Sequence, residues 1–310
     1  MAINYAALKQ RPFPDIAHTY GPTDCILYAL GVGAGMDPQD GGALAFTWER
    51  ELKALPTMAA VLGYPGFWLQ EPDTGLDWKT VLHIDQEIVL HRPLATSGTV
   101  IGRTRIEEIH DRGVKDGVGR GALLHTRRDI VDGMTGAPVA TVRLTELCRG
   151  EGGFGGPPPP RIVTRPFPED EPDGSLLLPV SPQAPLIYRL SGDDNALHVD
   201  PATARAAGFE RPILHGLSTF GMAGRAALRF FCGDEPARLK AMRVRFTAPV
   251  LPGDTLRVDM WHSAPGQGRF RAFVAREDRL VLDDGDVEFH PSPSAFRSDG
   301  RTCRMEEPDR

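Results

Sequence analysis

Apolar and polar residues alternate over two stretches that lie far apart in the chain, Thr99–Ile106 and Thr255–Trp261. Alternation with a period of two is typical of half-buried antiparallel strands. A strand-like run and a proline-containing step precede each stretch, at Arg92–Leu94 and at Ala248–Val250. Because both halves show the same order of strand, proline step and second strand, the pattern indicates a duplicated unit.

A candidate for a buried helix precedes each set of strands. Gly216–Cys232 (GLSTFGMAGRAALRFFC) is apolar on nearly all sides, and its small residues let a sheet approach closely. Its counterpart in the first half is Ala43–Leu62, which Pro56 interrupts. We therefore expect an α+β fold in which an antiparallel sheet is wrapped around a buried helix, twice.

Glycine and proline separate the two halves. Residues 149–160 read RGEGGFGGPPPP, and polar, proline-containing sequence continues to about residue 178. Such a stretch is typical of a linker between two units. We predict an N-terminal unit at residues 1–148, a linker at 149–178, a C-terminal unit at 179–290 and a disordered tail at 291–310.

Composition narrows the function classes. The 310 residues carry a net charge of −6, so the chain as a whole does not attract nucleic acid or an anionic membrane surface. The four cysteines lie far apart and form no CxxC pair, which argues against a zinc knuckle and against a disulfide framework. The first residues do not resemble a secretory signal, and no apolar run approaches the ~20 residues of a membrane helix. We expect a cytoplasmic protein.

Candidate chemistry is concentrated between Ser191 and His215. Asp193, Asn195 and His198 fall within six residues of irregular backbone. A carboxylate and an imidazole at this spacing can converge on one small molecule such as water, as general acid–base catalysis requires. Gly216 opens the buried helix, and its N–H, free of a neighbouring side chain, can meet a carbonyl oxygen as in an oxyanion hole.

Structural roles stay open on spacing alone. Asp193 also suits a turn or a cap, and His198 suits a satisfied core position. His215, just before a helix, suits a cap or a supporting group. The acidic and histidine residues include no i, i+4 histidine pair and fit no zinc spacing, so we expect no metal site.

Four segments carry a resemblance to a known family. YRLSGDDNALHVDP (188–201) followed by GFERPILHGLSTFG (208–221) resembles the hydratase 2 motif of the MaoC-like dehydratases. TDCILYALGVGAG near the start and KAMRVRFTAPVLPGDTLRVDMW near the end are similar to the (3R)-specific enoyl-CoA hydratase domain of peroxisomal multifunctional enzyme type 2. The resemblance covers about residues 15–290.

The resemblance implies a double hotdog fold, with two antiparallel sheets each wrapped around a long central helix and catalysis in the second half only. It places the acid–base pair on Asp193 and His198, the orienting asparagine on Asn195, and the carbonyl-binding amide on Gly216. Ala196 stands where relatives usually have proline. The implied reaction is reversible hydration of trans-2-enoyl-CoA to (3R)-3-hydroxyacyl-CoA in fatty-acyl metabolism, without a cofactor.

The first half then needs another role. We interpret it as degenerate and opened to accept an acyl chain, with the small residues Ala29–Gly35 and the break at Pro56 leaving the space. The alternative is that the same small residues pack closely in a filled core.

The substrate and partners follow from the same resemblance. Coenzyme A carries phosphates, so the basic residues of the second half are candidates for its binding, and His215 is a further substrate-binding candidate; the basic residues are Lys240, Arg243 and Arg245. We expect a homodimer by analogy with other hotdog folds. A hotdog thioesterase and a non-catalytic acyl-CoA-binding subunit are the competing interpretations.

Overall fold

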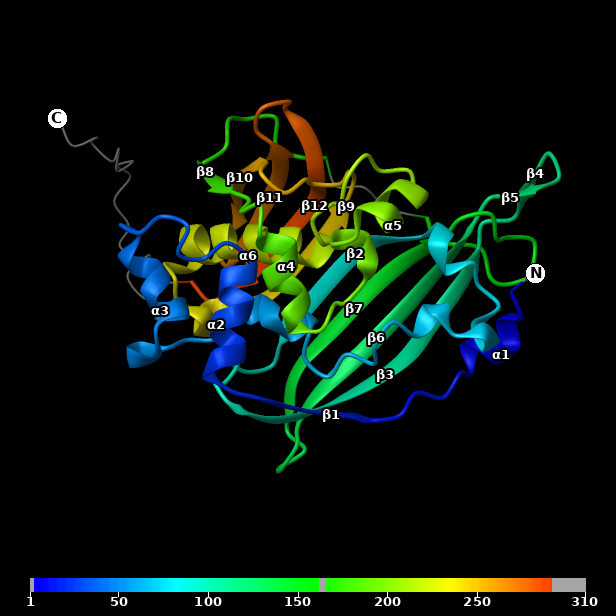
Figure 1. Ribbon diagram of the computed structural model, residues 1–310, viewed down its shortest axis with the longest axis horizontal. Helices are drawn as coiled ribbons and strands as arrows, with labels where there is room; N and C mark the ends of the chain where they lie inside the picture. The colour runs from blue at the N-terminus through cyan, green and yellow to red at the C-terminus, as the bar shows by residue number, and fades with distance from the viewer. Residues whose placement is uncertain (1–2, 162–165, 292–310) are drawn as a thin grey trace.

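Ten strands form one continuous antiparallel sheet in the computed structural model, which describes residues 3–161 and 166–291 (Figure 1). The order across the sheet is β1-β3-β6-β7-β2-β9-β12-β11-β10-β8. The strands are β1 (Ile16–Tyr20), β2 (Val81–Leu90), β3 (Gly98–Asp111), β6 (Ala122–Asp132), β7 (Pro138–Cys148), β8 (Gly174–Pro179), β9 (Leu239–Phe246), β10 (Thr255–Ala264), β11 (Gln267–Val274) and β12 (Arg279–Phe289). A separate small hairpin pairs β4 (Val114–Lys115) with β5 (Val118–Gly119).

The duplication expected from the sequence is confirmed by this topology. The first half runs β1-β3-β6-β7-β2 from its outer edge, and the second half runs β8-β10-β11-β12-β9, which is the same order. The two halves meet where β2 pairs with β9, from Asp85 opposite Arg245 to Val89 opposite Ala241. Main-chain hydrogen bonds between β2 and β9 join the sheets of the two halves edge to edge into one continuous sheet (Figure 1).

Helices lie mainly against one face of the sheet. They are α1 (Tyr5–Lys9), α2 (Pro22–Gly31), α3 (Leu44–Thr47), α4 (Ala184–Tyr188), α5 (Pro201–Ala206) and α6 (Gly216–Cys232). Short 3-10 helices are η1 (Gly41–Ala43), η2 (Glu49–Glu51), η3 (Pro56–Ala60), η4 (Trp68–Gln70), η5 (Pro72–Thr74), η6 (Trp78–Thr80), η7 (Arg189–Ser191), η8 (Ala196–His198) and η9 (Pro236–Arg238). In the part of the chain that the structure describes, none of the helices has the length and apolar character needed to cross a bilayer.

The helix predicted in the second half is confirmed. It forms α6, which packs against β8 to β12 and ends at Gly233 in the left-handed conformation. Its glycines also admit the first half of the chain. A Cβ on Gly221 would lie 2.4 Å from Cγ1 of Val32, and one on Gly224 would lie 2.4 Å from Cγ2 of Thr57. The small residues of α6 thus bring the two halves together.

The long helix predicted in the first half is wrong. Residues 43–62 form only short pieces, namely the end of η1, then α3, η2 and η3. Pro56 lacks an N–H and clashes with the preceding turn, so it can begin η3 but cannot continue a helix from Leu55. The longest helix of the first half is instead α2, which packs against α4.

The small residues at the end of α2 are used for close packing. A Cβ on Gly31 would lie 2.9 Å from the Cα of Tyr188, and Ala29 is 1 % exposed. At Ala29 and Gly31 the structure therefore favours the close-packed alternative over an opened cavity.

The predicted linker is shorter than expected. Residues 174–178 belong to β8, which pairs with β10, so the linker ends before Gly174. Its first part is held against β3, because the carboxylate of Asp111 accepts hydrogen bonds from the N–H groups of Gly153 and Gly155 at 2.8 and 2.9 Å. Residues 162–165 of the linker and residues 292–310 of the predicted tail lie outside the described residues.

Candidate active site

The segment between α4 and α5 is shaped by local capping. Gly192 has a φ of 110°, which reverses the chain after η7 and sends Asp193 inward. The side chain of Asn195 caps η8 by accepting a hydrogen bond from the N–H of Leu197 at 3.1 Å. Asp200 caps α5, because its carboxylate accepts hydrogen bonds from the N–H groups of Ala202 and Thr203.

Asp193, His198 and His215 converge. A carboxylate oxygen of Asp193 and a ring nitrogen of each histidine all lie within 4.8 Å of one another. The Nδ1 atom of His198 lies 3.0 Å from the main-chain oxygen of Ile213. Because a carbonyl only accepts, this nitrogen carries the proton and Nε2 keeps a free lone pair. His198 is therefore oriented as a base.

Burial shifts the pKa values of the pair in opposite directions. Burial raises the pKa of Asp193, and the neighbouring His198 partly offsets this rise. Burial lowers the pKa of His198, and Asp193 partly offsets that fall. The two pKa values approach each other, which favours transfer of a proton within the site.

His215 contacts both members of this pair. Its ring stacks on that of His198 with centroids 3.9 Å apart, and its Nε2 donates to the main-chain oxygen of Asp193 at 3.2 Å. Burial lowers the pKa of His215 to about 3, so the ring is neutral. His215 is 0 % exposed, which leaves it no surface for a substrate. We assign it a positioning role in place of the predicted substrate contact.

Gly216 offers a free donor beside the two histidines. It is the first residue of α6, so its N–H has no partner within the helix, and within the described residues no other acceptor pairs with it. A Cβ at this position would lie 3.5 Å from the Phe246 ring. The Gly216 amide therefore lies at the positive end of a buried helix, where it can stabilise a developing negative charge.

The three converging side chains do not fit a metal ion. A metal must lie in the plane of each imidazole that binds it, at about 2.0–2.1 Å from the nitrogen. The ring planes of His198 and His215 are stacked and inclined by 28°, so they intersect well beyond that distance. The arrangement is suited to holding a water molecule.

Sequence comparisons match both halves. The profile of the MFE-2 hydratase 2 N-terminal domain matches residues 18–150, and that of the MaoC like domain matches residues 164–281. The chain belongs to the MaoC-like hydratase 2 family. Membership of this family makes it a hydratase or dehydratase.

Named relatives of this MaoC-like chain cover most of its length. It is 41% identical over 275 residues to 3-hydroxyacyl-thioester dehydratase Y of Mycobacterium tuberculosis, covering 86% of this chain and 91% of the relative. It is 33% identical over 274 residues to an Arabidopsis thaliana protein named enoyl-CoA hydratase 2, peroxisomal, covering 83% and 87%.

Solved structures agree on the fold of the MaoC-like chain. A MaoC-like dehydratase from Phytophthora capsici is 32% identical and has a TM-score of 0.80, covering 93% of this chain and 99% of that one. A Mycobacterium tuberculosis protein described as a double hotdog has a TM-score of 0.53 at 18% identity, covering 89% and 93%. The double hotdog fold expected from the sequence is thus confirmed.

The basic residues predicted for coenzyme A lie elsewhere. Arg243 and Arg245 alternate along β9 with the buried Met242 and Val244, and Lys240 is exposed near the start of the strand. Each pairs with carboxylates, at 3.9 Å from Glu288, 2.8 Å from Asp286 and 3.1 Å from Asp85 respectively. The structure does not bring them together with Asp193, so their assignment to phosphate binding receives no support from the geometry.

Sequence reasoning missed the contribution of the first half to this MaoC-like site. Tyr64 follows η3, and burial together with the nearby Asp193 carboxylate raises its pKa well above the usual range. The ring of His83, from β2, packs on that of Phe246 at 4.9 Å, and burial lowers the pKa of His83 to about 4. No local pattern identifies Tyr64 or His83, because only the tertiary fold places them near the motif.

Proposed function

We propose that this chain catalyses the reversible hydration of trans-2-enoyl-CoA to (3R)-3-hydroxyacyl-CoA. The observation that carries the proposal is the convergence of the Asp193 carboxylate and the His198 imidazole next to the free N–H of Gly216. The names of the relatives, which include an enoyl-CoA hydratase 2 and a 3-hydroxyacyl-thioester dehydratase, support the same reaction.

Each group has one role in this reaction. Asp193 and His198 hold a water molecule against C3 of the substrate and remove a proton from it as its oxygen bonds to C3. The pair then delivers a proton to C2. Meanwhile the double bond becomes a single bond, and negative charge that develops on the thioester oxygen is stabilised by the N–H of Gly216. Asn195 holds the loop between the acid and the base through its cap of η8.

The first half supplies the far wall of the site in this proposal. Tyr64 lies near the Asp193 carboxylate although the two residues come from different halves of the chain. We propose that the first half accepts the acyl chain while the second half performs the chemistry. The cytoplasmic location stays a prediction, since one relative is named peroxisomal. The homodimer expected from the sequence also stays a prediction.

Asp193→Asn tests the proposal, with Asp194→Asn as a matched control. Asp194 is the next residue and is exposed, whereas Asp193 lies in the cluster with the two histidines. We expect Asp193→Asn to lower the rate of crotonyl-CoA hydration by roughly 10²- to 10⁴-fold, and Asp194→Asn to leave it nearly unchanged. Retention of most of the rate by a folded Asp193→Asn protein would refute the assignment. Release of free coenzyme A thiol by the wild-type protein would identify a thioesterase instead.

A further inference from the structure

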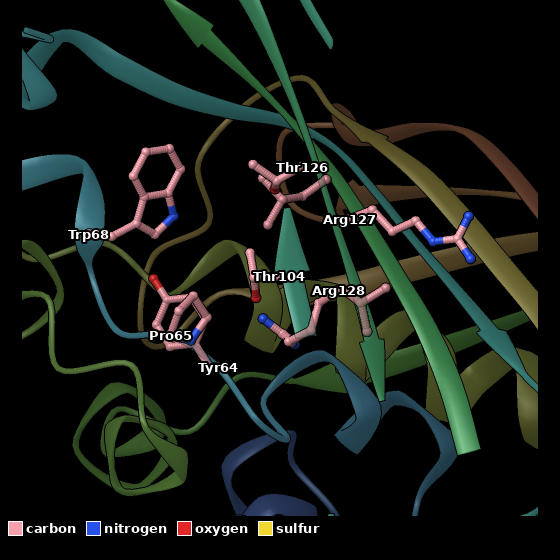
Figure 2. A pocket seen from close by; sticks show the side chains of 9 residues that line it. Tyr64, Pro65, Trp68, Thr104, Thr126, Arg127 and Arg128 are labelled. Atoms are coloured by element: carbon pink, nitrogen blue, oxygen red, sulfur yellow. The ribbon is translucent and has the colours of Figure 1, made fainter. Parts of the chain in front are cut away.

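A pocket on the inner face of the first half contains a buried arginine. Its walls include Tyr64, Trp68, Thr104, Arg128 and Leu144 (Figure 2). Arg128 comes from β6 and is 4 % exposed. Figure 2 shows its side chain directed toward Tyr64 and Thr104, whereas Arg127 also borders the pocket but directs its guanidinium away from it.

The charge of Arg128 lacks an anionic partner. Among residues 3–161 and 166–291, no carboxylate lies within 4.0 Å of its guanidinium, and its one hydrogen-bond acceptor is the main-chain oxygen of Ala60. Its Nε is buried without a partner. Burial lowers the pKa of Arg128 to about 10, so the group stays charged at neutral pH. A buried cation without an anion lowers the stability of the folded protein. Retention of such a group therefore indicates a functional role.

The adjacent Arg127 shows the usual arrangement. On the opposite face of the same strand, its guanidinium lies 2.7 Å from Asp129 and 3.6 Å from Glu107. The outer face of the sheet thus supplies Arg127 with carboxylates, whereas Glu146, on the same face of the sheet as Arg128, forms no ion pair with it among the described residues.

Other polar groups of the pocket are also incompletely paired. The Oγ1 atom of Thr104 is buried and has no hydrogen-bond partner in the described part of the chain. The ring of Tyr64 lies 5.5 Å from the guanidinium of Arg128. Pro65, Trp68, Val142 and Leu144 give the pocket apolar sides, and Thr126 adds one more hydroxyl. The pocket thus combines apolar sides with a small cluster of donors, which is typical of a ligand site.

Tyr64 connects this pocket to the candidate active site. It lines the pocket and also lies near the carboxylate of Asp193. Tyr64 is therefore the residue that the pocket and the surroundings of the Asp193 carboxylate have in common.

We propose that the pocket around Arg128 is an acyl-chain subsite that binds a hydrogen-bond-accepting oxygen carried by the chain, with Thr104 as a second donor. This inference rests on the proposed function, because it assumes that the acyl chain extends from Asp193 past Tyr64. A carboxylate, with which a guanidinium forms two parallel hydrogen bonds, is the acceptor that fits Arg128 best, and a hydroxyl is the neutral alternative.

Equilibrium binding of saturated acyl-CoAs tests the subsite without depending on hydration. The probes are straight-chain acyl-CoAs of six to twelve carbons, each compared with its ω-carboxy and ω-hydroxy counterpart. For the wild-type protein we expect an oxygenated chain of one length to bind roughly 10-fold tighter than the plain chain, because charge-assisted hydrogen bonds form in a buried site.

Variants locate the effect. Arg128→Met keeps most of the apolar stem and should abolish the preference, and Thr104→Val should reduce it about two- to five-fold. Arg127→Met removes a guanidinium from the opposite face and should retain the full preference. If Arg128→Met fails to fold, the preference for oxygenated chains is compared between Thr104→Val and Arg127→Met. A reduced preference in Thr104→Val alone supports the subsite, and an equal preference in both variants contradicts it.

Two results would overturn the inference. One is wild-type protein that binds plain chains as tightly as oxygenated chains at every length. The other is a preference that persists in folded Arg128→Met, which would leave Arg128 with only its structural bond to Ala60. Hydration of crotonyl-CoA by the same preparation tests the proposed function separately. Failure of the subsite and failure of the proposed function are therefore distinguishable.

Discussion

The imidazole rings of His198 and His215 lie face to face, with centroids 3.9 Å apart and planes inclined by 28°. Each ring donates one N–H to a main-chain oxygen, that of Ile213 or that of Asp193. Two stacked imidazolium ions would repel each other, and His198 contributes to the lowered pKa of His215. The stack therefore keeps both rings neutral and aligned. The pKa values of the two histidines thus depend on the contact between their rings.

The pH dependence of activity should reflect this stack. Burial lowers the pKa of His198 below its usual value of 6.5, so the base of the folded protein takes up a proton only at a lower pH. We expect kcat/KM for crotonyl-CoA to stay high down to pH 6.5 and to fall only below it. Initial rates between pH 4.5 and 8 check this prediction, and an acid limb centred above pH 6.5 would contradict it.

His215 should act through Asp193 and not on the substrate. His215→Gln keeps a nitrogen donor near the position of Nε2, whereas His215→Phe keeps an aromatic ring but removes the donor to Asp193. We expect His215→Phe to lower kcat about 5-fold with little change in KM, because one hydrogen bond of ~1 kcal/mol orients Asp193. His215→Gln should retain more activity than His215→Phe. The reverse order would show that the stacked ring matters more than the donor.

Packing of α2 against α4 should tolerate no side chain at Gly31. A methyl group there would lie 2.9 Å from the Cα of Tyr188, which is main chain and cannot move aside cheaply. We expect Gly31→Ala to destabilise the protein by about 1–3 kcal/mol. Gly41→Ala is the control, because a Cβ at Gly41 meets nothing within 4 Å. Denaturant unfolding of both variants measures the difference, and equal stabilities would count against the close packing.

Glu146 should lower stability increasingly as the pH rises. It lies on β7, its buried Oε2 has no hydrogen-bond partner among the described residues, and burial raises its pKa to about 8. In the unfolded chain the carboxyl loses its proton near pH 4.5, while in the folded chain it holds it until about pH 8. The cost to folding therefore grows through this interval and stays constant above it.

Glu146→Gln removes that cost. We expect the variant to match the wild-type melting temperature near pH 4.5 and to exceed it by about 5 °C at pH 8. Glu210→Gln, at an exposed position, should show no such trend. A Glu146→Gln protein with the same advantage at both pH values would indicate a packing effect instead.

Features that depend on near neighbours along the chain were predictable. The alternation in Thr99–Ile106 and Thr255–Trp261 became β3 and β10, and the apolar stretch Gly216–Cys232 became α6. The sequence also predicted that Asp193 and His198 converge, because caps and turns within a dozen residues bring them to the same loop. Periodicity and capping are local properties, so the sequence alone determined these elements.

Contacts between distant segments decided the rest. The break at Pro56 was visible, yet only packing showed that α2 and η3, and not a long helix, cover the sheet of the first half. The approach of Gly31 to Tyr188, the arrival of Tyr64 beside Asp193 and the unpaired charge of Arg128 all join residues that are far apart in sequence. Burial and neighbouring charge set the pKa of a group, and both arise only when the two halves close on each other, so the tertiary structure alone decided them.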